Sequence, residues 1–337
     1  MNNTPLSTTA SDPKRRNLRA PIVIALAVVA LGAPMVLGTY AVHAMVIALI
    51  FLLPAHGLNL LVGYTGMLSL AQAAFFGLGA YASALMSIHL GTSFPVNMLA
   101  AIALACVIAV PLGIPALRLR DTSFVMCTLG FVIIGQAISK NWISVTRGDM
   151  GLNNIDKPTV GLAGYSWTAS NPVEAYYLAL VLAAFATWVF WLVVRSPAGR
   201  NLVAIRENET LAESLGIPTW NYRLAAFVIA AGFGGAGGSL YVHYISVASP
   251  LMFQTLYTTT MLIIVLGGGA GSITGVIFGS FLFVALSEGL RIAPELRMIA
   301  YGLSLLILVF RFPQGFAPFL MRIWDWAGGV DKKEGSA

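Results

Sequence analysis

Charged side chains are scarce in this chain of 337 residues, at 9% of the total, whereas hydrophobic residues make up 58%. A soluble domain has about 25% charged residues because its surface faces water, so an ordinary soluble enzyme is excluded. No charge occurs in the 98 residues between Arg19 and Arg118, or in the 64 residues between Arg223 and Glu288. Since a helix crosses the hydrocarbon core with roughly 20 apolar residues, these runs predict an all-α, polytopic integral membrane protein.

Reactive side chains are equally scarce. Cys106 and Cys127 both lie inside apolar runs and fit small hydrophobic residues better than a disulfide or metal pattern. His56 is the most central titratable residue of the predicted membrane core, and no Ser/His/Asp set, carboxylate pair or His/Cys cluster can be assembled around it. We therefore expect no catalytic residue, no metal site and no cofactor in this chain. The lack of acidic or lysine relays in the bilayer also argues against ion coupling.

Stretches rich in glycine, proline or charge divide residues 21–312 into about ten predicted membrane-spanning helices. These are 21–38, 41–62, 67–90, 96–117, 122–139, 174–194, 223–245, 255–267, 272–289 and 297–312. Residues 1–20 and 313–337 form predicted terminal tails. The first span is longer than a signal-peptide core and is expected to stay uncleaved, and the span 255–267 is short for a full crossing.

Basic residues set the predicted orientation. The two tails, the turn at Arg118 and Arg120 and the loop 195–222 together have 14 Lys or Arg, counting Arg223 and Arg311, whereas the other side has five. By the positive-inside rule both termini and the loop 195–222 are cytoplasmic, and the loop 140–173 is extracytoplasmic. Because basic residues gather on the cytoplasmic side of membrane proteins, the net charge of +6 does not indicate a nucleic-acid partner.

The cytoplasmic loop 195–222 contains a stretch that is too polar to cross a membrane. The pattern predicts one helix from Asn201 to Leu215, ended by Gly216. Its charged side chains and its apolar stripe are Arg206, Glu207, Glu209 and Glu213, and Leu202, Ile205, Leu211, Ala212 and Leu215. A solvated connector is one interpretation, but an apolar edge on a cytoplasmic helix is better explained by docking onto a partner protein.

Glycine is concentrated at three places. Two cytoplasmic turns, 63–66 and 267–272, lack the lysine of a phosphate loop, so nucleotide binding there is not expected. Five glycines between Gly232 and Gly238 crowd the centre of the span 223–245, where close helix packing is favoured over an unwound segment that lines a cavity.

Apart from His56, the polar side chains at the centre of the predicted membrane core are uncharged amides and hydroxyls. Asn59, Ser69 and Gln72 are candidates for a translocation path because they can hydrogen-bond a passing zwitterion. For Asn59 and Gln72, hydrogen bonding between helices is the alternative.

The stretch from Leu58 to Tyr81, LNLLVGYTGMLSLAQAAFFGLGAY, resembles the signature of LivM-type permeases, the membrane subunits of ABC importers for branched-chain amino acids. Residues 117–120, 146–152 and 199–217 agree with the same family in the same order, so that the similarity covers roughly residues 40–315. One departure is Arg147, where the family often has a second glycine.

The resemblance implies a permease of the bacterial inner membrane that moves branched-chain or similar small amino acids inward by alternating access. It implies as partners a second, LivH-type permease, two cytoplasmic ATPases that use ATP and an extracytoplasmic solute-binding protein. The ATPase-facing loop of the family carries over onto residues 200–216. The implied coupling residues are Arg200, Arg206, Glu207, Asn208, Glu209, Ala212, Leu215 and Gly216.

Three alternatives stay open at this stage. Related permeases for urea, amides and other small solutes share most of these motifs. An ion-coupled secondary transporter would lose uptake in the presence of an ionophore. A purely structural subunit, beside a partner permease that forms the path, would on deletion lower the amount of complex without changing its selectivity.

The charge distribution makes a testable prediction about topology. With cysteines introduced at Asp156 and at Glu209, an impermeant thiol reagent applied to intact spheroplasts should modify position 156 and spare position 209. Labelling of both positions, or the reverse pattern, would contradict the orientation.

Overall fold

The computed structural model describes residues 30–289 apart from 36, 120 and 163–164, together with residues 303, 315 and 316. In this part of the chain six helices are long and apolar enough to cross a membrane. They are α2 (Thr39–Asn59) with its π-helical continuation η1 (Leu60–Thr65), α3 (Gln72–Leu90), α4 (Phe94–Ala116), α5 (Asp121–Asn141), α7 (Pro172–Arg195) and α10 (Thr219–Ile245). Two shorter apolar helices follow, α11 (Thr255–Gly268) and α12 (Ile273–Gly289).

These helices confirm the predicted all-α, multi-pass membrane fold. Eight of the ten predicted spans correspond to α2 with η1, α3, α4, α5, α7, α10, α11 and α12. The predicted span 297–312, most of the span 21–38 and both terminal tails lie outside the described residues, although residues 30–35 are helical.

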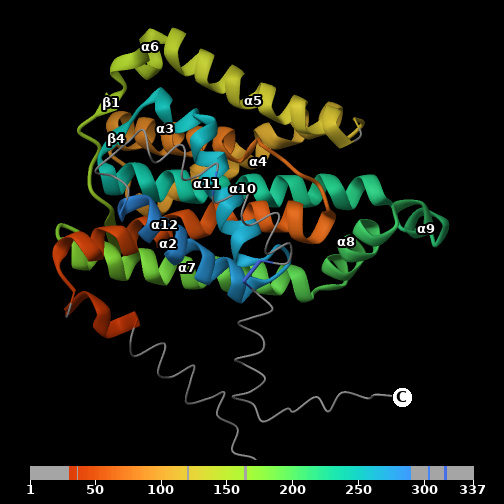
Figure 1. Cartoon of the computed structure of the whole chain (residues 1–337). Coiled ribbons are helices and arrows are strands. Elements are labelled where there is room, and N and C mark those ends of the chain that lie inside the picture. The colour runs from red at the N-terminus through yellow and green to blue at the C-terminus, as the bar shows by residue number, and fades with distance from the viewer. Residues whose placement is uncertain are drawn as a thin grey trace, which may run out of the picture.

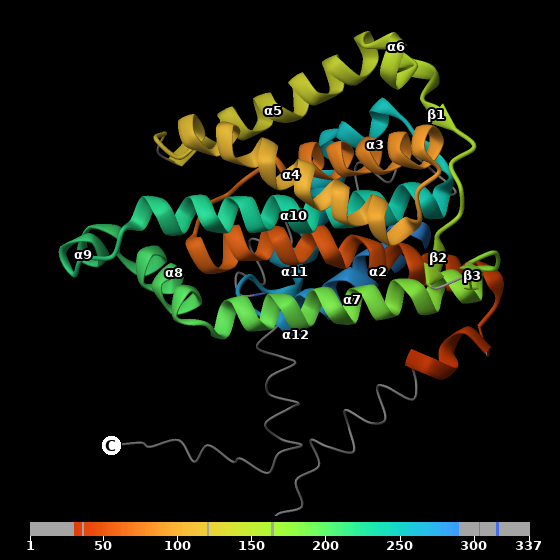
Figure 2. The same cartoon turned by 180° about the vertical axis from the view of Figure 1, so that it is seen from behind.

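Helix α10 lies at the centre of the bundle (Figure 1), and it packs against α3, α4 and α2. Helices α5 and α7 lie on opposite outer edges, and α7 continues into the short helices α8 (Pro197–Glu207) and α9 (Glu209–Ser214) at one end of the molecule (Figure 2). We call this end the α8–α9 end. The turns that follow α2, α4 and α11 lie at the same end, as the predicted topology requires.

The glycines of α10 explain how three helices can approach it so closely. Gly235 faces α4, where an added Cβ would lie 2.7 Å from the carbonyl oxygen of Ala101. Gly237 faces α2, where a Cβ would lie 2.6 Å from Pro54, and Gly238 faces α3, where a Cβ would overlap the backbone of Phe76. The packing explanation of this glycine cluster is therefore the correct one.

Two segments inside the bundle are not regular α-helix. Residues 66–70 have no regular secondary structure, so the expectation of a helix from residue 67 is wrong and α3 begins at Gln72. A 3-10 turn, η3 (Pro250–Phe253), precedes α11, whose 14 residues give a length of only about 21 Å. A full crossing needs about 30 Å, which agrees with the short span predicted at 255–267.

Hydroxyl groups from neighbouring helices hydrogen-bond the backbone at the end of the irregular segment 66–70 and at the start of α3. Thr128 of α5 accepts a hydrogen bond from the Leu70 amide (3.1 Å), and Thr258 of α11 accepts one from the Ala73 amide (3.0 Å). Thr258 also donates to the Leu70 carbonyl (3.1 Å). Non-helical backbone is tolerated at membrane depth only with such partners, so α5 and α11 hold the start of α3 in place.

The end opposite α8 and α9 contains the predicted loop 140–173, which has short regular elements. A one-turn helix, α6 (Ile143–Thr146), and a 3-10 turn, η2 (Gly148–Met150), lead to β1 (Leu152–Asn153), which pairs antiparallel with β4 (Val247–Ala248). β2 (Thr159–Leu162) and β3 (Tyr165–Thr168) form an antiparallel pair beside them. Arg147 has a φ of 57°, a conformation that favours glycine.

A buried hydrogen-bonded chain ties this loop to the bundle. His243, near the end of α10, donates from Nδ1 to the carbonyl oxygen of Asp156 (2.7 Å), and its Nε2 lies 2.9 Å from the Ser83 hydroxyl of α3. Ser83 in turn bonds Ser239 (2.8 Å). The loop is thus fixed to α3 and α10 both by strand pairing and by these side chains.

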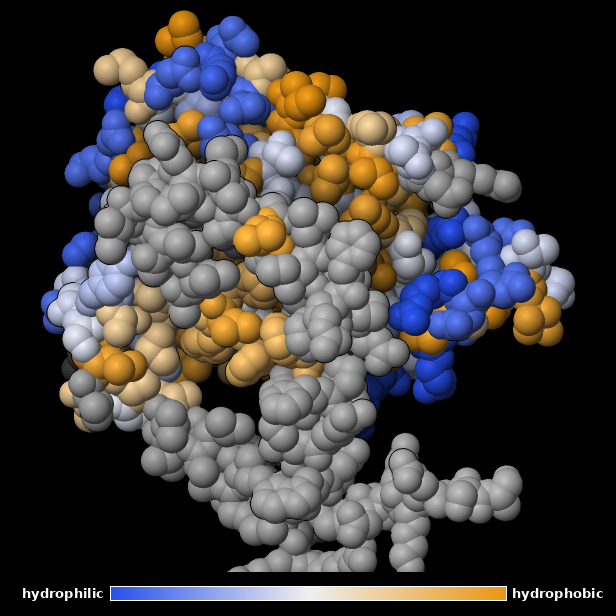
Figure 3. Space-filling view, viewed as in Figure 1, coloured by the Kyte–Doolittle hydropathy of each residue, from blue (hydrophilic) through white to orange (hydrophobic). Residues whose placement is uncertain are grey.

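The outer surface has the polarity of a membrane protein. Hydrophilic residues gather at the α8–α9 end and near α6, with hydrophobic residues between them (Figure 3). Large apolar side chains are exposed along the outer helices; they are Leu99, Val107, Met126, Ile133, Ile134, Val181, Phe185 and Trp188. Contiguous apolar surface of this kind marks contact with lipid or with another protein.

Substitution of Gly238 should test the close packing of α10. Gly238→Ala puts a methyl group onto the backbone of Phe76, and we expect it to destabilise the protein by roughly 1–3 kcal/mol. The readout is thermal unfolding of the detergent-purified protein, followed by size-exclusion chromatography. Gly130→Ala in α5 is the matched control, because no atom lies within 4 Å of its added Cβ. Equal unfolding curves for the two variants would contradict the packing role.

Candidate functional site

The loop between α7 and α10 forms two helices rather than the single helix predicted over 201–215. Helix α8 starts earlier, at Pro197, because the Ser196 hydroxyl caps it by accepting from the Gly199 amide (3.2 Å). Asn208 then adopts an extended conformation, with φ −160° and ψ 104°, and its side chain caps α9 by accepting from the Leu211 amide (3.0 Å). Asn side chains compete in this way with helical backbone bonding.

The predicted stop at Gly216 agrees with the structure. Gly216 has a φ of 81°, a left-handed conformation that suits glycine, and its amide donates to the Glu213 carbonyl (2.9 Å). The chain then enters α10 at Thr219.

The apolar stripe of this loop is largely covered by the chain itself, which corrects the expectation of an uncovered edge. Leu202, Ile205 and Ala212 are buried, with Ala212 only 3% exposed. The physical reason is that α8 packs against η1, α7 and α10, and α9 packs against α10. Leu211 and Leu215 remain outside, at 56% and 74% exposure. Of the predicted stripe, Leu211 and Leu215 are therefore available for contact with a partner, and Ala212 serves the internal packing of the loop.

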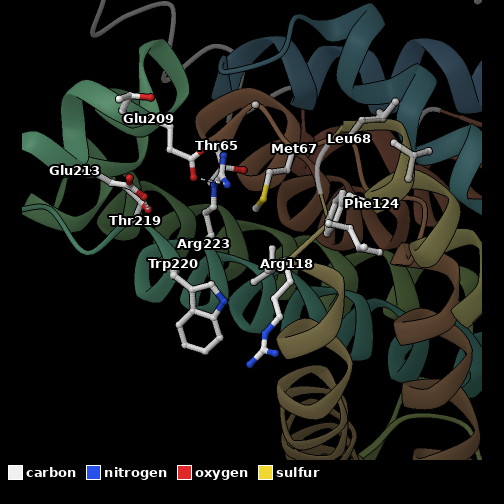
Figure 4. Close-up of a pocket in the computed structure, with 15 residues that line it drawn as sticks. Thr65, Met67, Leu68, Arg118, Phe124, Glu209, Glu213, Thr219, Trp220 and Arg223 are labelled. Atoms are coloured by element: carbon white, nitrogen blue, oxygen red, sulfur yellow. Dashed lines mark hydrogen bonds and ion pairs between the residues drawn. The ribbon is translucent and has the colours of Figure 1, made fainter.

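The charged residues of the loop divide into paired and exposed groups. Glu209 forms an ion pair with Arg223 of α10 (2.6 Å), and Glu213 accepts from the Thr219 hydroxyl (2.8 Å). Figure 4 shows Arg223 pointing from α10 towards Glu209, with Glu213 beside Thr219. Arg200 is exposed, and so is Glu207, which forms a surface ion pair with Arg206 (3.2 Å). The contacts of Glu209 and Glu213 fix α9 to the start of α10, a function that the sequence pattern did not indicate.

A pocket of about 680 Å³ lies between α9 and the turn that joins α4 to α5 (Figure 4). Its lining residues are Thr65, Gly66, Met67, Leu68, Leu117, Arg118, Leu119, Phe124, Val125, Glu209, Thr210, Glu213, Thr219, Trp220 and Arg223. Sequence reasoning missed this pocket, because its residues come from four segments. The signals available were two Arg residues at the edges of the charge-free runs: Arg118, where charge returns after the first run, and Arg223, the last charge before the second.

The two glycine-rich turns meet at the same end. Asn59 accepts a hydrogen bond from the Gly271 amide (2.8 Å), and the Tyr64 hydroxyl donates to the Gly271 carbonyl (2.8 Å). Gly63 approaches so closely that an added Cβ would overlap Gly271. Arg206 of α8 donates from Nη1 to the Gly63 carbonyl oxygen. We call Asn59, Gly63, Tyr64 and Gly271 the glycine junction.

The three candidates for a translocation path, Asn59, Ser69 and Gln72, are buried. Gln72 donates from Nε2 to the carbonyl oxygens of Pro54 in α2 (3.0 Å) and Ala230 in α10 (3.1 Å). The Ser69 hydroxyl accepts from the Ala71 amide (3.3 Å). None of the three is among the residues that line the pocket. The Gln72 bonds are those expected for packing between helices, whereas the Ser69 bond is local. A role of the three residues in the path stays a prediction.

His56 is also part of the interior. Its Nε2 lies 2.9 Å from the Thr187 hydroxyl of α7, and its ring stacks on Phe190 at 4.8 Å between centroids. Among the residues that the structure describes, no three His, Cys, Asp or Glu side chains come together as a metal site would require.

Comparison with known proteins identifies the family. The model for the branched-chain amino acid transport system permease component matches residues 40–310. The high-affinity branched-chain amino acid transport permease LivM of Escherichia coli is 31% identical over 93% of this chain and 78% of its own length. The LivM protein of Salmonella typhimurium is 32% identical over 88% and 74%. The galactose/methyl galactoside import permease MglC of Haemophilus influenzae is 26% identical over 64% and 65%.

The family match covers the six long helices, the α8–α9 loop and the glycine junction together. The chain belongs to the family of permease components of branched-chain amino acid transport systems.

Proposed function

We propose that this chain imports branched-chain or closely related small amino acids, as one of two permease subunits in an ATP-driven importer of the bacterial inner membrane. The observation that supports the proposal most is the α8–α9 loop, an exposed helical connection fixed to both α10 and the glycine junction. The chain is a membrane permease subunit rather than an enzyme, and ATP hydrolysis belongs to separate ATPase subunits. The further partners proposed are a second, LivH-type permease, two ATPase subunits and an extracytoplasmic binding protein.

The substrate class is inferred from two observations. The relatives with about 31–32% identity over most of this chain are named for branched-chain amino acids, whereas the galactose permease is less similar and covers less of the chain. An amino acid zwitterion has no net charge, so it needs no permanent counter-ion of the kind that an ion-coupled carrier keeps within the bilayer. This agrees with the uncharged stretches that form α2, α3 and α4.

The path is proposed to run between this chain and its partner permease. A path along that interface would be lined by side chains that are exposed in the single chain, such as those on α4 and α5. Asn59, Ser69 and Gln72 are buried, and they would meet the substrate only if the packed helices around them moved apart. Alternating access requires relative motion of packed helices around such a path.

Energy enters, in this proposal, at the α8–α9 end. Leu211 and Leu215 are the exposed apolar side chains of α9 and its C-cap, and Arg200 and Glu207 are exposed charges on α8. Because binding energy concentrates in a few central apolar contacts with a polar rim, we expect Leu211 and Leu215 to enter a groove of the ATPase. ATP-driven closure of two ATPases would then move α8 and α9.

Uptake in proteoliposomes tests the proposed function. The complete complex, with binding protein outside and ATP inside, should accumulate labelled leucine, and a proton ionophore should leave that uptake unchanged. Uptake of an amide or urea in place of leucine would overturn the substrate class. Uptake that needs no ATP but is abolished by the ionophore would overturn the ATP-driven mechanism.

Substitution of Leu215 tests the docking surface. Leu215→Asp would bury an unpaired carboxylate in the ATPase groove, at a cost of about 2–4 kcal/mol, and should remove the ATPase on co-purification in detergent. Ile143→Asp is the matched control, since Ile143 is 71% exposed at the opposite end of the molecule. ATPase retention by Leu215→Asp at the level of the control would show that α9 is only a connector.

A further inference from the structure

Arg206 is the coupling-loop residue whose side chain hydrogen-bonds the glycine junction. Its Nη1 donates to the Gly63 carbonyl oxygen, and Nη1 also lies 3.8 Å from the Cβ position of Gly271. Its Cγ lies 3.0 Å from the Cβ position of Gly66, which has a φ of 73°. Any side chain at Gly66 would therefore press on Arg206 as well as strain the backbone.

The Gly63 carbonyl is a suitable acceptor for a cation. It lies in η1, three residues before Gly66, which is the C-cap of that helix. The last carbonyl groups of a helix have no intrahelical partner, and cationic side chains favour this negative end of the helix dipole. A guanidinium donor makes the bond charge-assisted and hence stronger than a neutral one. Glu207 holds the other side of the guanidinium at 3.2 Å.

The acceptor belongs to a connected part of the bundle. Through Asn59 and Tyr64, η1 is bonded to Gly271 in the turn between α11 and α12. Helix α2 packs directly against α11 and α12. A displacement of the glycine junction would thus move α2, α11 and α12 together, whereas α8 is joined to the junction by apolar packing and by Arg206.

We propose that Arg206 is a positioning residue that transmits movement of α8 to the glycine junction, so that α2, α11 and α12 follow the ATPases. The inference rests on the proposed function, because it requires ATPases that move α8. In this role Arg206 does not touch the substrate, and it acts through the Gly63 carbonyl.

Distance measurement between two spin labels tests this role without any substrate. The labels are placed at Ala204 on α8 and at Ala270 beside Gly271, both exposed, in a protein with Cys106 and Cys127 replaced by alanine. In the complex with wild-type Arg206 the distance should stay the same with and without ATP and vanadate. With Arg206→Ala, addition of ATP and vanadate should shift or broaden the distribution of label distances, because α8 then moves without the junction. Equal behaviour of the two proteins would overturn the proposal.

The ratio of uptake to ATP hydrolysis provides a second test, which a purely structural role would not change. Arg206→Ala should keep the ATPases bound and lower uptake per ATP hydrolysed by about ten-fold, and Arg206→Lys should recover part of that loss because it keeps a charged donor. Arg195→Ala is the matched control, since the Arg195 guanidinium lies over Trp191 (4.8 Å) rather than at the junction. An unchanged ratio in Arg206→Ala would overturn the proposal.

These tests separate the two hypotheses. A wild-type complex that binds ATPases but takes up no branched-chain amino acid would overturn the proposed substrate, while the label distances would still decide the role of Arg206. A wild-type protein that binds no ATPase would overturn both.

Discussion

The contact of the glycine face of α10 with α2, α3 and α4 sets the geometry of the whole bundle. Within a bilayer apolar side chains gain little by leaving lipid for protein, so helices associate through close backbone approach and polar contacts. Gly235, Gly237 and Gly238 allow this approach on three sides of one helix. The bonds from Gln72 to α2 and α10 and the Ser83–Ser239 bond form across these contacts, and they depend on the short separation that glycine permits.

Polar groups in the interior follow from the same constraint. The irregular segment at 66–70 and the turn at Pro250–Phe253 leave backbone groups without α-helical partners, and lipid cannot hydrogen-bond them. Thr128 and Thr258 supply the missing partners for the start of α3. The scarcity of charge therefore does not mean that the interior is purely apolar, because hydroxyl groups stabilise the irregular segment before α3.

Much of the fold could be predicted from the sequence, because charge-free runs and lipid thickness determine helix number and length with few assumptions. Local signals near helix ends are less decisive, because Asn208 divides the α8–α9 loop into two helices and Ser196 begins it earlier than the sequence pattern predicts. The glycine junction could not be predicted at all. Asn59 and Gly271 are 212 residues apart, and no periodicity connects them. Ala212 was expected at a partner surface because burial against α10 leaves no trace in the local pattern.

Helix α10 is a single uninterrupted helix of 27 residues, about 40 Å in length. One end begins beside the Glu209–Arg223 ion pair, and the other ends at His243, which holds the Asp156 backbone. A rigid rod fixed at both ends cannot shift at one face of the membrane without displacing the other. Coupling of this kind is reciprocal. An event that repositions the loop 140–173 must change the free energy of rearrangement at α9, and a rearrangement at α9 must change the free energy of repositioning that loop by the same amount.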